Sequence, residues 1–135
     1  MTTLTQYSDA RPLDAIDEPR TRSLARAIAL WTLQAGAAAM FLMAGYLKLS
    51  GVPVMVQLFD TIGFGQWFRY LTGAIEVISG VLLLVPSLAF FAAAILAATM
   101  VGAVITHLFV VGGSPAPAAV LLAATGAVAW LRRPR

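Results

Sequence analysis

AIALWTLQAGAAAMFLMAGYL, residues 27–47, is a run of 21 residues without a charged side chain. An α-helix rises about 1.5 Å per residue, so roughly 20 apolar residues are enough to cross the hydrocarbon core of a bilayer. The run therefore predicts a membrane-spanning helix over residues 27–47. A secretory signal peptide is the rival interpretation, with Arg20 to Arg26 as its charged region and Ala37-Ala38-Ala39 as a cleavage-like site.

Three further apolar runs follow, at about residues 68–85, 88–111 and 115–131. The link between the first two of them is only Pro86-Ser87, which predicts an antiparallel hairpin. Pro115 and Pro117 begin the last run, and proline fits the first turn of a helix because the missing N–H has no partner there anyway. The sequence thus predicts an all-α fold, a transmembrane four-helix bundle covering residues 27–131.

The longer link, residues 48–67, contains an apolar stripe at helical spacing. Its members are Val54, Met55, Leu58, Phe59 and Ile62. Pro53 precedes the stripe and Gly63 follows it, as expected at the two ends of a helix. We predict a short helix here that lies in the membrane interface. Trp67, Phe68 and Tyr70 then indicate an aromatic belt where the next helix enters the membrane.

The composition agrees with a membrane protein. The chain is 60% hydrophobic and 11% charged, whereas soluble domains are roughly 45–50% apolar and about 25% charged. The formal charge of +3 does not indicate nucleic-acid binding, because the basic residues flank apolar runs instead of clustering on a polar face. There is no cysteine, which excludes disulfides, thiolate metal sites and CxxC redox chemistry.

The distribution of Lys and Arg predicts the orientation. Residues 1–26, which we expect to be a flexible cytoplasmic tail, hold four arginines, and the basic C-terminus 132–135 holds three. The link between the first two spans carries two basic residues, Lys48 and Arg69, and the other two loops carry none. Cytoplasmic segments carry the excess of positive charge. Both termini are therefore predicted to be cytoplasmic, in a multi-pass protein of the bacterial inner membrane.

Small residues recur every fourth position in the last two runs: Ala94, Ala98, Gly102 and Thr106, then Ala119, Ala123 and Ala127. Such rows let membrane helices approach closely, although alanine-rich helices also show them by chance. We predict a tight bundle that associates as a homo-oligomer or with another membrane subunit.

Glu76 is the most informative residue, because a carboxylate inside a bilayer costs on the order of 2.5–3.5 kcal/mol. Gly73 and Gly80 lie on the same helical face, so Glu76 should point toward a neighbouring helix. Helical rise places Lys48 and His107 at a comparable depth in the outer half of the membrane. Arg69 and Tyr70 should lie just above them.

These five residues have two interpretations. In the first, Lys48 and Arg69 extend to the interface and Glu76 is a structural acid paired with one of them. In the second, they form a polar pocket for the head group of a quinone or a lipid, with Glu76 and His107 binding or exchanging protons. One histidine and one carboxylate are too few for a metal site, and no catalytic arrangement is visible.

Three motifs resemble the DoxX-like family of small four-helix membrane proteins. They are GYLKL at residues 45–49, YLTGAIEVISGVLLLVP at residues 70–86 and GAVITH at residues 102–107. The resemblance implies a four-helix bundle and an association with membrane redox systems, including subunits of thiosulfate:quinone oxidoreductases. Lys48, Glu76 and His107 match recurrent polar positions of the family.

We therefore expect a membrane subunit that binds a quinone-like or lipidic ligand and supports a redox partner protein, without an intrinsic cofactor and without catalysing a reaction alone. A structural or assembly subunit is the alternative. A small transporter is a third possibility, but neither paired repeats nor broken helices are visible.

Overall fold

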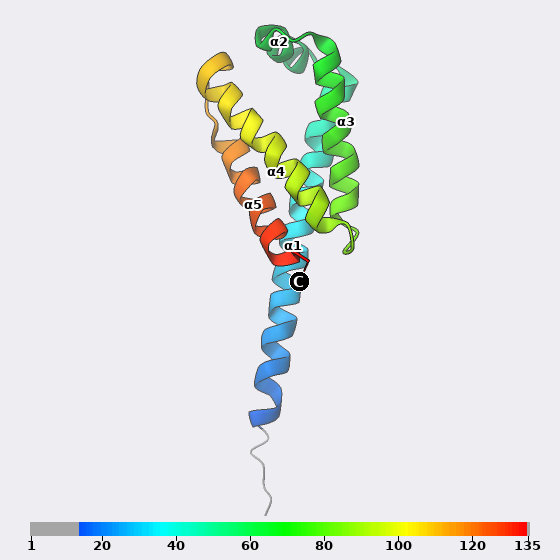
Figure 1. The fold of residues 1–135 in the computed structure, drawn as a ribbon, viewed down its shortest axis with the longest axis vertical. Coiled ribbons are helices and arrows are strands. Elements are labelled where there is room, and N and C mark those ends of the chain that lie inside the picture. The colour runs from blue at the N-terminus through cyan, green and yellow to red at the C-terminus, as the bar shows by residue number, and fades with distance from the viewer. Residues whose placement is uncertain (1–13, 135) are drawn as a thin grey trace, which may run out of the picture.

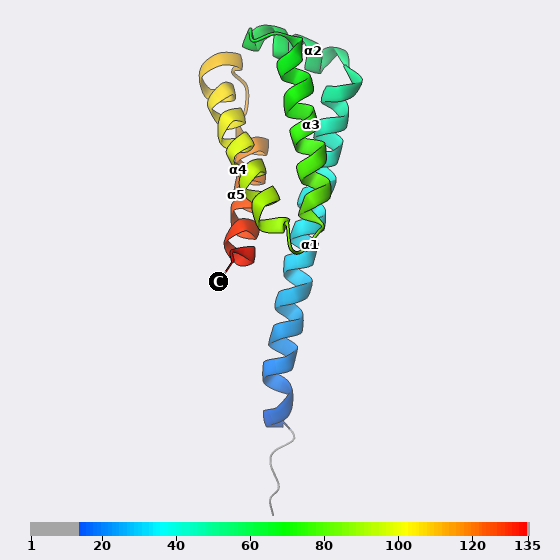
Figure 2. The same cartoon turned by 45° about the vertical axis from the view of Figure 1, so that its right-hand side comes forward.

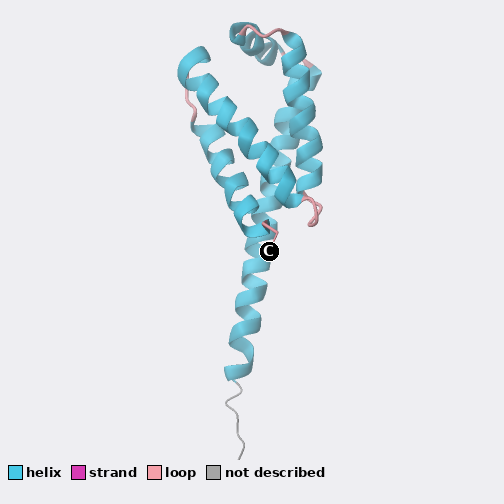
Figure 3. Cartoon of the chain, in the orientation of Figure 1, coloured by secondary structure: helices cyan, strands magenta, loops and turns pink. Residues whose placement is uncertain are grey.

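The computed structural model describes residues 14–134, and all regular structure in that range is helical (Figure 3). The helices are α1 (Asp14–Ser50), α2 (Pro53–Ile62), α3 (Gln66–Leu83), α4 (Ala89–Thr106) and α5 (Ala116–Arg132). A π-helical turn, η1 (His107–Val111), continues α4 directly. The predicted helices over 68–85, 88–111 and 115–131 agree with α3, with α4 plus η1, and with α5.

The first helix is longer than the sequence indicated. We expected residues 1–26 to form a flexible tail, and this is wrong for residues 14–26, which are the start of α1. Once an apolar helix is nucleated, each added residue gains a backbone hydrogen bond at little further cost, so a polar extension can continue it. Residues 1–13 lie outside the described residues.

The helices pack as two pairs, α1 with α3 and α4 with α5. The pairs lie close together where α3 turns into α4, and they diverge toward the opposite end, where α2 lies across the opening (Figures 1 and 2). The N-terminal part of α1 projects beyond the narrow end, and the C-terminus lies at that same end. Both ends of the described chain are therefore found on the side away from α2.

Glycines permit the close contact between α1 and α3. A Cβ atom added at Gly45 would lie 2.6 Å from Val77 Cγ2 and 2.8 Å from the carbonyl oxygen of Gly73. A Cβ atom at Gly73 would lie 3.0 Å from the Cβ atom of Lys48. These distances leave no room for a side chain, so the two backbones touch directly.

The rows of small residues on α4 and α5 do not form the predicted seam within the chain. Their exposed members are Ala94, Ala98, Gly102, Ala119, Ala123 and Ala127. A Cβ atom added at Gly102 would meet nothing within 4 Å. Ala98 and Gly102 line a cavity, and association through these exposed rows stays a prediction.

The core is centred on Phe41, Leu83, Leu96 and Val128, all of which are fully buried. Gln34 of α1 is also fully buried, in the run that carries no charged side chain. Its Nε2 donates to the carbonyl oxygen of Leu83, and its Oε1 accepts from Arg132 Nε at 3.2 Å. This side chain therefore joins α1 to the ends of α3 and α5.

Two helical stretches, Arg20–Ser50 and Ala89–Val111, are long and apolar enough to cross a membrane. α5 has 17 residues and is shorter than those stretches, and α3 carries Arg69 and Glu76. Large apolar side chains also cover the outside of the helices, for example Phe109, Val120 and Ile78. Helices suited to a bilayer are thus present, while the crossing of the membrane by all four long helices stays a prediction.

Candidate functional site

A cavity of about 820 Å³ lies at the wide end of the bundle, beneath α2. Side chains from all five α-helices and from η1 line it. Most of the lining is aliphatic or aromatic, and the polar side chains are Lys48, Thr72, Glu76, Thr99, Thr106 and His107. The site is therefore an apolar chamber with a small number of polar groups.

α2 closes the end of this cavity with its apolar face. Met55, Leu58, Phe59 and Ile62 all line the cavity, whereas Val54, the remaining member of the predicted stripe, is exposed. The helix starts at Pro53 and stops at Gly63, which has a φ of 85° in the left-handed region where glycine is favoured. Its predicted bounds are confirmed, and its stripe faces the bundle.

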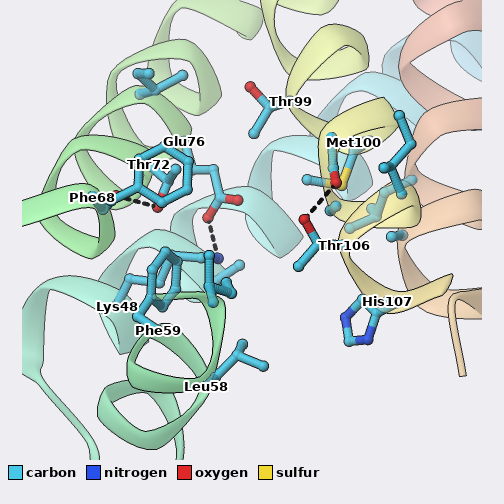
Figure 4. Close-up of a pocket in the computed structure, with 18 of the residues that line it drawn as sticks. Lys48, Leu58, Phe59, Phe68, Thr72, Glu76, Thr99, Met100, Thr106 and His107 are labelled. Atoms are coloured by element: carbon cyan, nitrogen blue, oxygen red, sulfur yellow. Dashed lines mark hydrogen bonds and ion pairs between the residues drawn. The ribbon is translucent and has the colours of Figure 1, made fainter. Parts of the chain in front are cut away.

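Lys48 and Glu76 form an ion pair in the wall of the cavity (Figure 4). Lys48 Nζ lies 2.7 Å from Glu76 Oε2, and the side chain of Glu76 is 2% exposed. Lys48 is in the last turn of α1 and Glu76 is in the middle of α3. The prediction that Glu76 faces a neighbouring helix is confirmed, because the glycine contact between α1 and α3 brings the two charges together.

His107 lies on the other helix pair and lines the same cavity. In Figure 4 it stands apart from Lys48 and Glu76, on the side of the cavity formed by α4 and η1. Its Nδ1 lies 3.1 Å from the carbonyl oxygen of Gly112. The three residues thus share one chamber, but within the described structure only Lys48 and Glu76 touch.

The sequence pattern of the DoxX-like family matches residues 32–131, which include Lys48, Glu76 and His107. The chain belongs to the DoxX-like family. No curated protein and no solved structure matches it. Membership of this family, together with the two long apolar helices, indicates that this DoxX-like chain is a membrane protein.

Arg69 and Tyr70, the other two candidates, do not line the cavity of this DoxX-like protein. Arg69 is buried, and its guanidinium donates to the carbonyl oxygen of Lys48 and, at 2.6 Å, to Gln66 Oε1. It also lies 4.3 Å from the ring centroid of Tyr70, which is half exposed. Arg69 therefore caps the C-terminal end of α1, where helical carbonyls lack intrahelical partners.

Three threonines of the cavity wall escaped the sequence analysis. Thr72 lies on α3, and Thr99 and Thr106 lie seven residues apart on one face of α4. Thr106 belongs to the row of small residues that the sequence indicated as a packing surface. The spacing of Thr99, Thr106 and His107 along one helix is the only sign in the sequence that these two threonines belong to the site. That spacing does not indicate a site unless the position of the cavity is known. Within the described residues there is no group of three or more His, Asp or Glu that could hold a metal ion.

Proposed function

We propose that this DoxX-like protein is an integral membrane subunit that binds a quinone-like or other lipidic ligand in the cavity beneath α2. In this proposal the four long helices cross the membrane, and the cavity lies in the outer half of the bilayer. The observation that carries the proposal is the chamber itself, in which a buried ion pair and a histidine interrupt an apolar wall.

The size and lining of the cavity suit an amphipathic molecule. Ligand pockets usually enclose about 300–1,000 Å³ and are mainly apolar, with a few polar groups that fix the orientation of the ligand. The volume of about 820 Å³ is within this range. The ring centroid of Phe68 lies 5.9 Å from that of Phe59 and 5.3 Å from that of Phe64, and these rings offer flat surfaces to a ring or a chain.

An apolar ligand could enter from the side of the bundle. Ile95 and Ile105 of α4 line the cavity and are 48% and 51% exposed, and we propose that the chamber opens to the outer surface along that helix. In a membrane protein, this surface faces lipid. A lipidic molecule would reach the ion pair from the bilayer without passing through water.

The redox association rests on the family resemblance. The chain has no cysteine, and we propose that it carries no redox group of its own and instead supports a membrane partner that does. A quinone-like ligand held near Glu76 and His107 would be the link to such a partner. The chain itself would bind and position the ligand.

A structural subunit is the second candidate, and the ion pair favours it. Lys48 already gives Glu76 a cationic partner within the chain. A buried carboxylate that is neutralised in this way does not need a ligand. The two candidate functions differ in whether the cavity binds a ligand, so a binding measurement distinguishes them.

The test measures equilibrium binding of a hydroquinone with a decyl tail, kept reduced under anaerobic conditions, to the full chain in nanodiscs, corrected with empty nanodiscs. We expect Glu76→Gln and His107→Ala to weaken binding about tenfold, as for the loss of one hydrogen bond to a charged or polar group. Tyr70→Phe is the control, since Tyr70 lies outside the cavity and should leave binding unchanged. Unchanged binding in both cavity variants, with helical content and elution volume preserved, would support the structural subunit.

A further inference from the structure

The threonine hydroxyls around the cavity have already used their protons. Thr72 Oγ1 donates to the carbonyl oxygen of Phe68 at 3.0 Å, and Thr99 Oγ1 donates to that of Ile95 at 3.0 Å. Thr106 Oγ1 donates to the carbonyl oxygen of Gly102 at 2.8 Å. A hydroxyl has one proton and two lone pairs. What these side chains can still offer to a ligand is therefore acceptor capacity.

Glu76 and His107 add further acceptors. Lys48 bonds one oxygen of Glu76, and no described residue donates to the other, which points away from Lys48 into the cavity in Figure 4. The carbonyl oxygen of Gly112 can only accept, so Nδ1 of His107 carries the proton in their contact. In the neutral ring, Nε2 is then an acceptor.

Donors are scarce by comparison. Among the described side chains of the cavity wall, Lys48 alone retains N–H protons that its neighbours do not use, and one of its three goes to Glu76. The charges of Lys48 and Glu76 offset each other. The chamber therefore has no excess positive charge with which to hold a phosphate.

We infer that the cavity selects an apolar molecule whose neutral head group donates a hydrogen bond, such as a phenol, a hydroquinone or a long-chain alcohol. A molecule of the same shape whose head group only accepts finds a side-chain donor in Lys48 alone among the described residues of the wall, and places its lone pairs against those of Glu76 and of the threonine oxygens elsewhere. This inference rests on the proposed function, because it requires that the cavity binds a ligand. It goes further by naming the chemical class of the head group.

The expected preference follows from the charged acceptor. A hydrogen bond to an ionised group changes affinity by on the order of tenfold to a hundredfold, more than one between neutral groups. The hydroxyl form of a matched pair should therefore bind at least about tenfold more tightly than the form that lacks the proton.

The experiment uses probes that differ in that proton. Para-dodecylphenol is compared with its methyl ether, and dodecanol with dodecyl methyl ether, on the full chain in nanodiscs. The first pair represents an aromatic head group and the second an aliphatic one. The pair whose hydroxyl member binds more tightly therefore shows which kind of head group the cavity prefers. Because an ether partitions into lipid differently from an alcohol, the quantity compared is the ratio of the two affinities across protein variants, in which partitioning cancels.

Thr99→Val and Thr106→Val keep the side-chain shape and remove acceptor oxygens, so each should lower the ratio severalfold. Thr125→Val is the matched control. Thr125 makes the same hydroxyl bond to a carbonyl four residues earlier, at 2.8 Å to Leu121, but it lies in the core outside the cavity. Its ratio should equal that of the unaltered chain.

The outcomes separate the inference from the proposal beneath it. Saturable binding with a preference for the hydroxyl forms that falls in Thr99→Val or Thr106→Val supports both. Saturable binding with a ratio of hydroxyl to ether affinity that is the same in Thr99→Val, in Thr106→Val and in the unaltered chain overturns the inference and leaves the proposed function standing. No saturable binding of any probe to the folded chain overturns the proposed function, and the inference with it.

Discussion

At the scale of single residues, the Lys48–Glu76 pair sets the energetics of the cavity wall. Removing both ions from water is costly, and their attraction offsets this cost when they are in contact, here at 2.7 Å. Deleting one partner leaves the other charge buried and unpaired, which typically costs about 3–5 kcal/mol. Replacing both ions by apolar side chains of similar volume is often close to neutral.

We therefore expect Lys48→Met alone to lower the free energy of unfolding by about 3–5 kcal/mol. The double variant Lys48→Met/Glu76→Leu should recover most of that loss. Unfolding of the full chain in mixed micelles with increasing denaturing detergent measures both. Arg26→Met, a change at an exposed cation, is the control and should stay within about 0.5 kcal/mol. A double variant that loses as much as Lys48→Met, or more, would contradict a coupled pair.

The sequence predicted that Glu76 faces a neighbouring helix, because glycines on the same face mark where a second helix approaches, but it left the partner open between Lys48 and Arg69. The helical face alone could not separate Arg69 from Glu76, because seven residues are two helical turns and both side chains are buried on one face of α3. Arg69 reaches the end of α1 and Glu76 reaches into the cavity. The contact between His107 and Gly112 depends on the π-helical turn, which the sequence pattern does not reveal.

At the scale of helices, α1 and α3 make the closest helix contact found at any glycine of the chain, because a Cβ atom added at Gly45 would meet its nearest atom at 2.6 Å. Gly45 faces both a side chain and a backbone carbonyl, and a carbonyl cannot rotate away as a flexible side chain can. The same sequence has other helical glycines with open space around them, Gly36 and Gly126 among them. The number of glycines in a helix therefore does not show where it packs against another helix. The atoms around each glycine in the structure do show it.

Gly45→Ala should accordingly destabilise the bundle by about 1–3 kcal/mol, the usual cost of forcing an extra carbon atom into a packed contact. Gly126→Ala should be neutral or stabilise it by up to about 1 kcal/mol, because alanine favours a helix more than glycine does. The same detergent unfolding assay compares the two. Equal stability of both variants would show that α1 and α3 do not pack through Gly45.

The helical elements were predicted well because long apolar runs with proline and glycine at their ends determine helix positions almost alone. The sequence did not predict which way the rows of small residues face, because Ala98 and Gly102 suit a close helix contact, a cavity wall and a lipid-facing surface equally. In the structure they line the cavity and are exposed. Which of these roles applies depends on how far α4 and α5 diverge from α1 and α3. That divergence is set by the packing of all the helices together, so it cannot be predicted from one row of residues.

At the scale of the molecule, charge and architecture support one orientation. The described ends of the chain lie at the narrow end of the bundle, and α2 lies at the wide end (Figures 1 and 2). Seven of the nine Lys and Arg residues lie in the terminal segments 1–26 and 132–135. The other two, Lys48 and Arg69, are bonded within the wide end. Positive charge favours the cytoplasm, so the narrow end should be cytoplasmic and the cavity should lie in the outer half of the membrane.

Because the chain has no cysteine, this orientation can be tested with single introduced thiols. Ser114 is exposed in the loop between η1 and α5, and Ser87 is exposed in the turn between α3 and α4, at the opposite end of the bundle. In intact cells, a membrane-impermeant maleimide should label Ser114→Cys and should not label Ser87→Cys until the membrane is permeabilised. Each loop follows a helix that must cross the bilayer completely if the four-span arrangement holds. Labelling of both positions from outside would mean that α4 does not span the membrane, and labelling of Ser87→Cys alone would place the termini and the narrow end outside the cell.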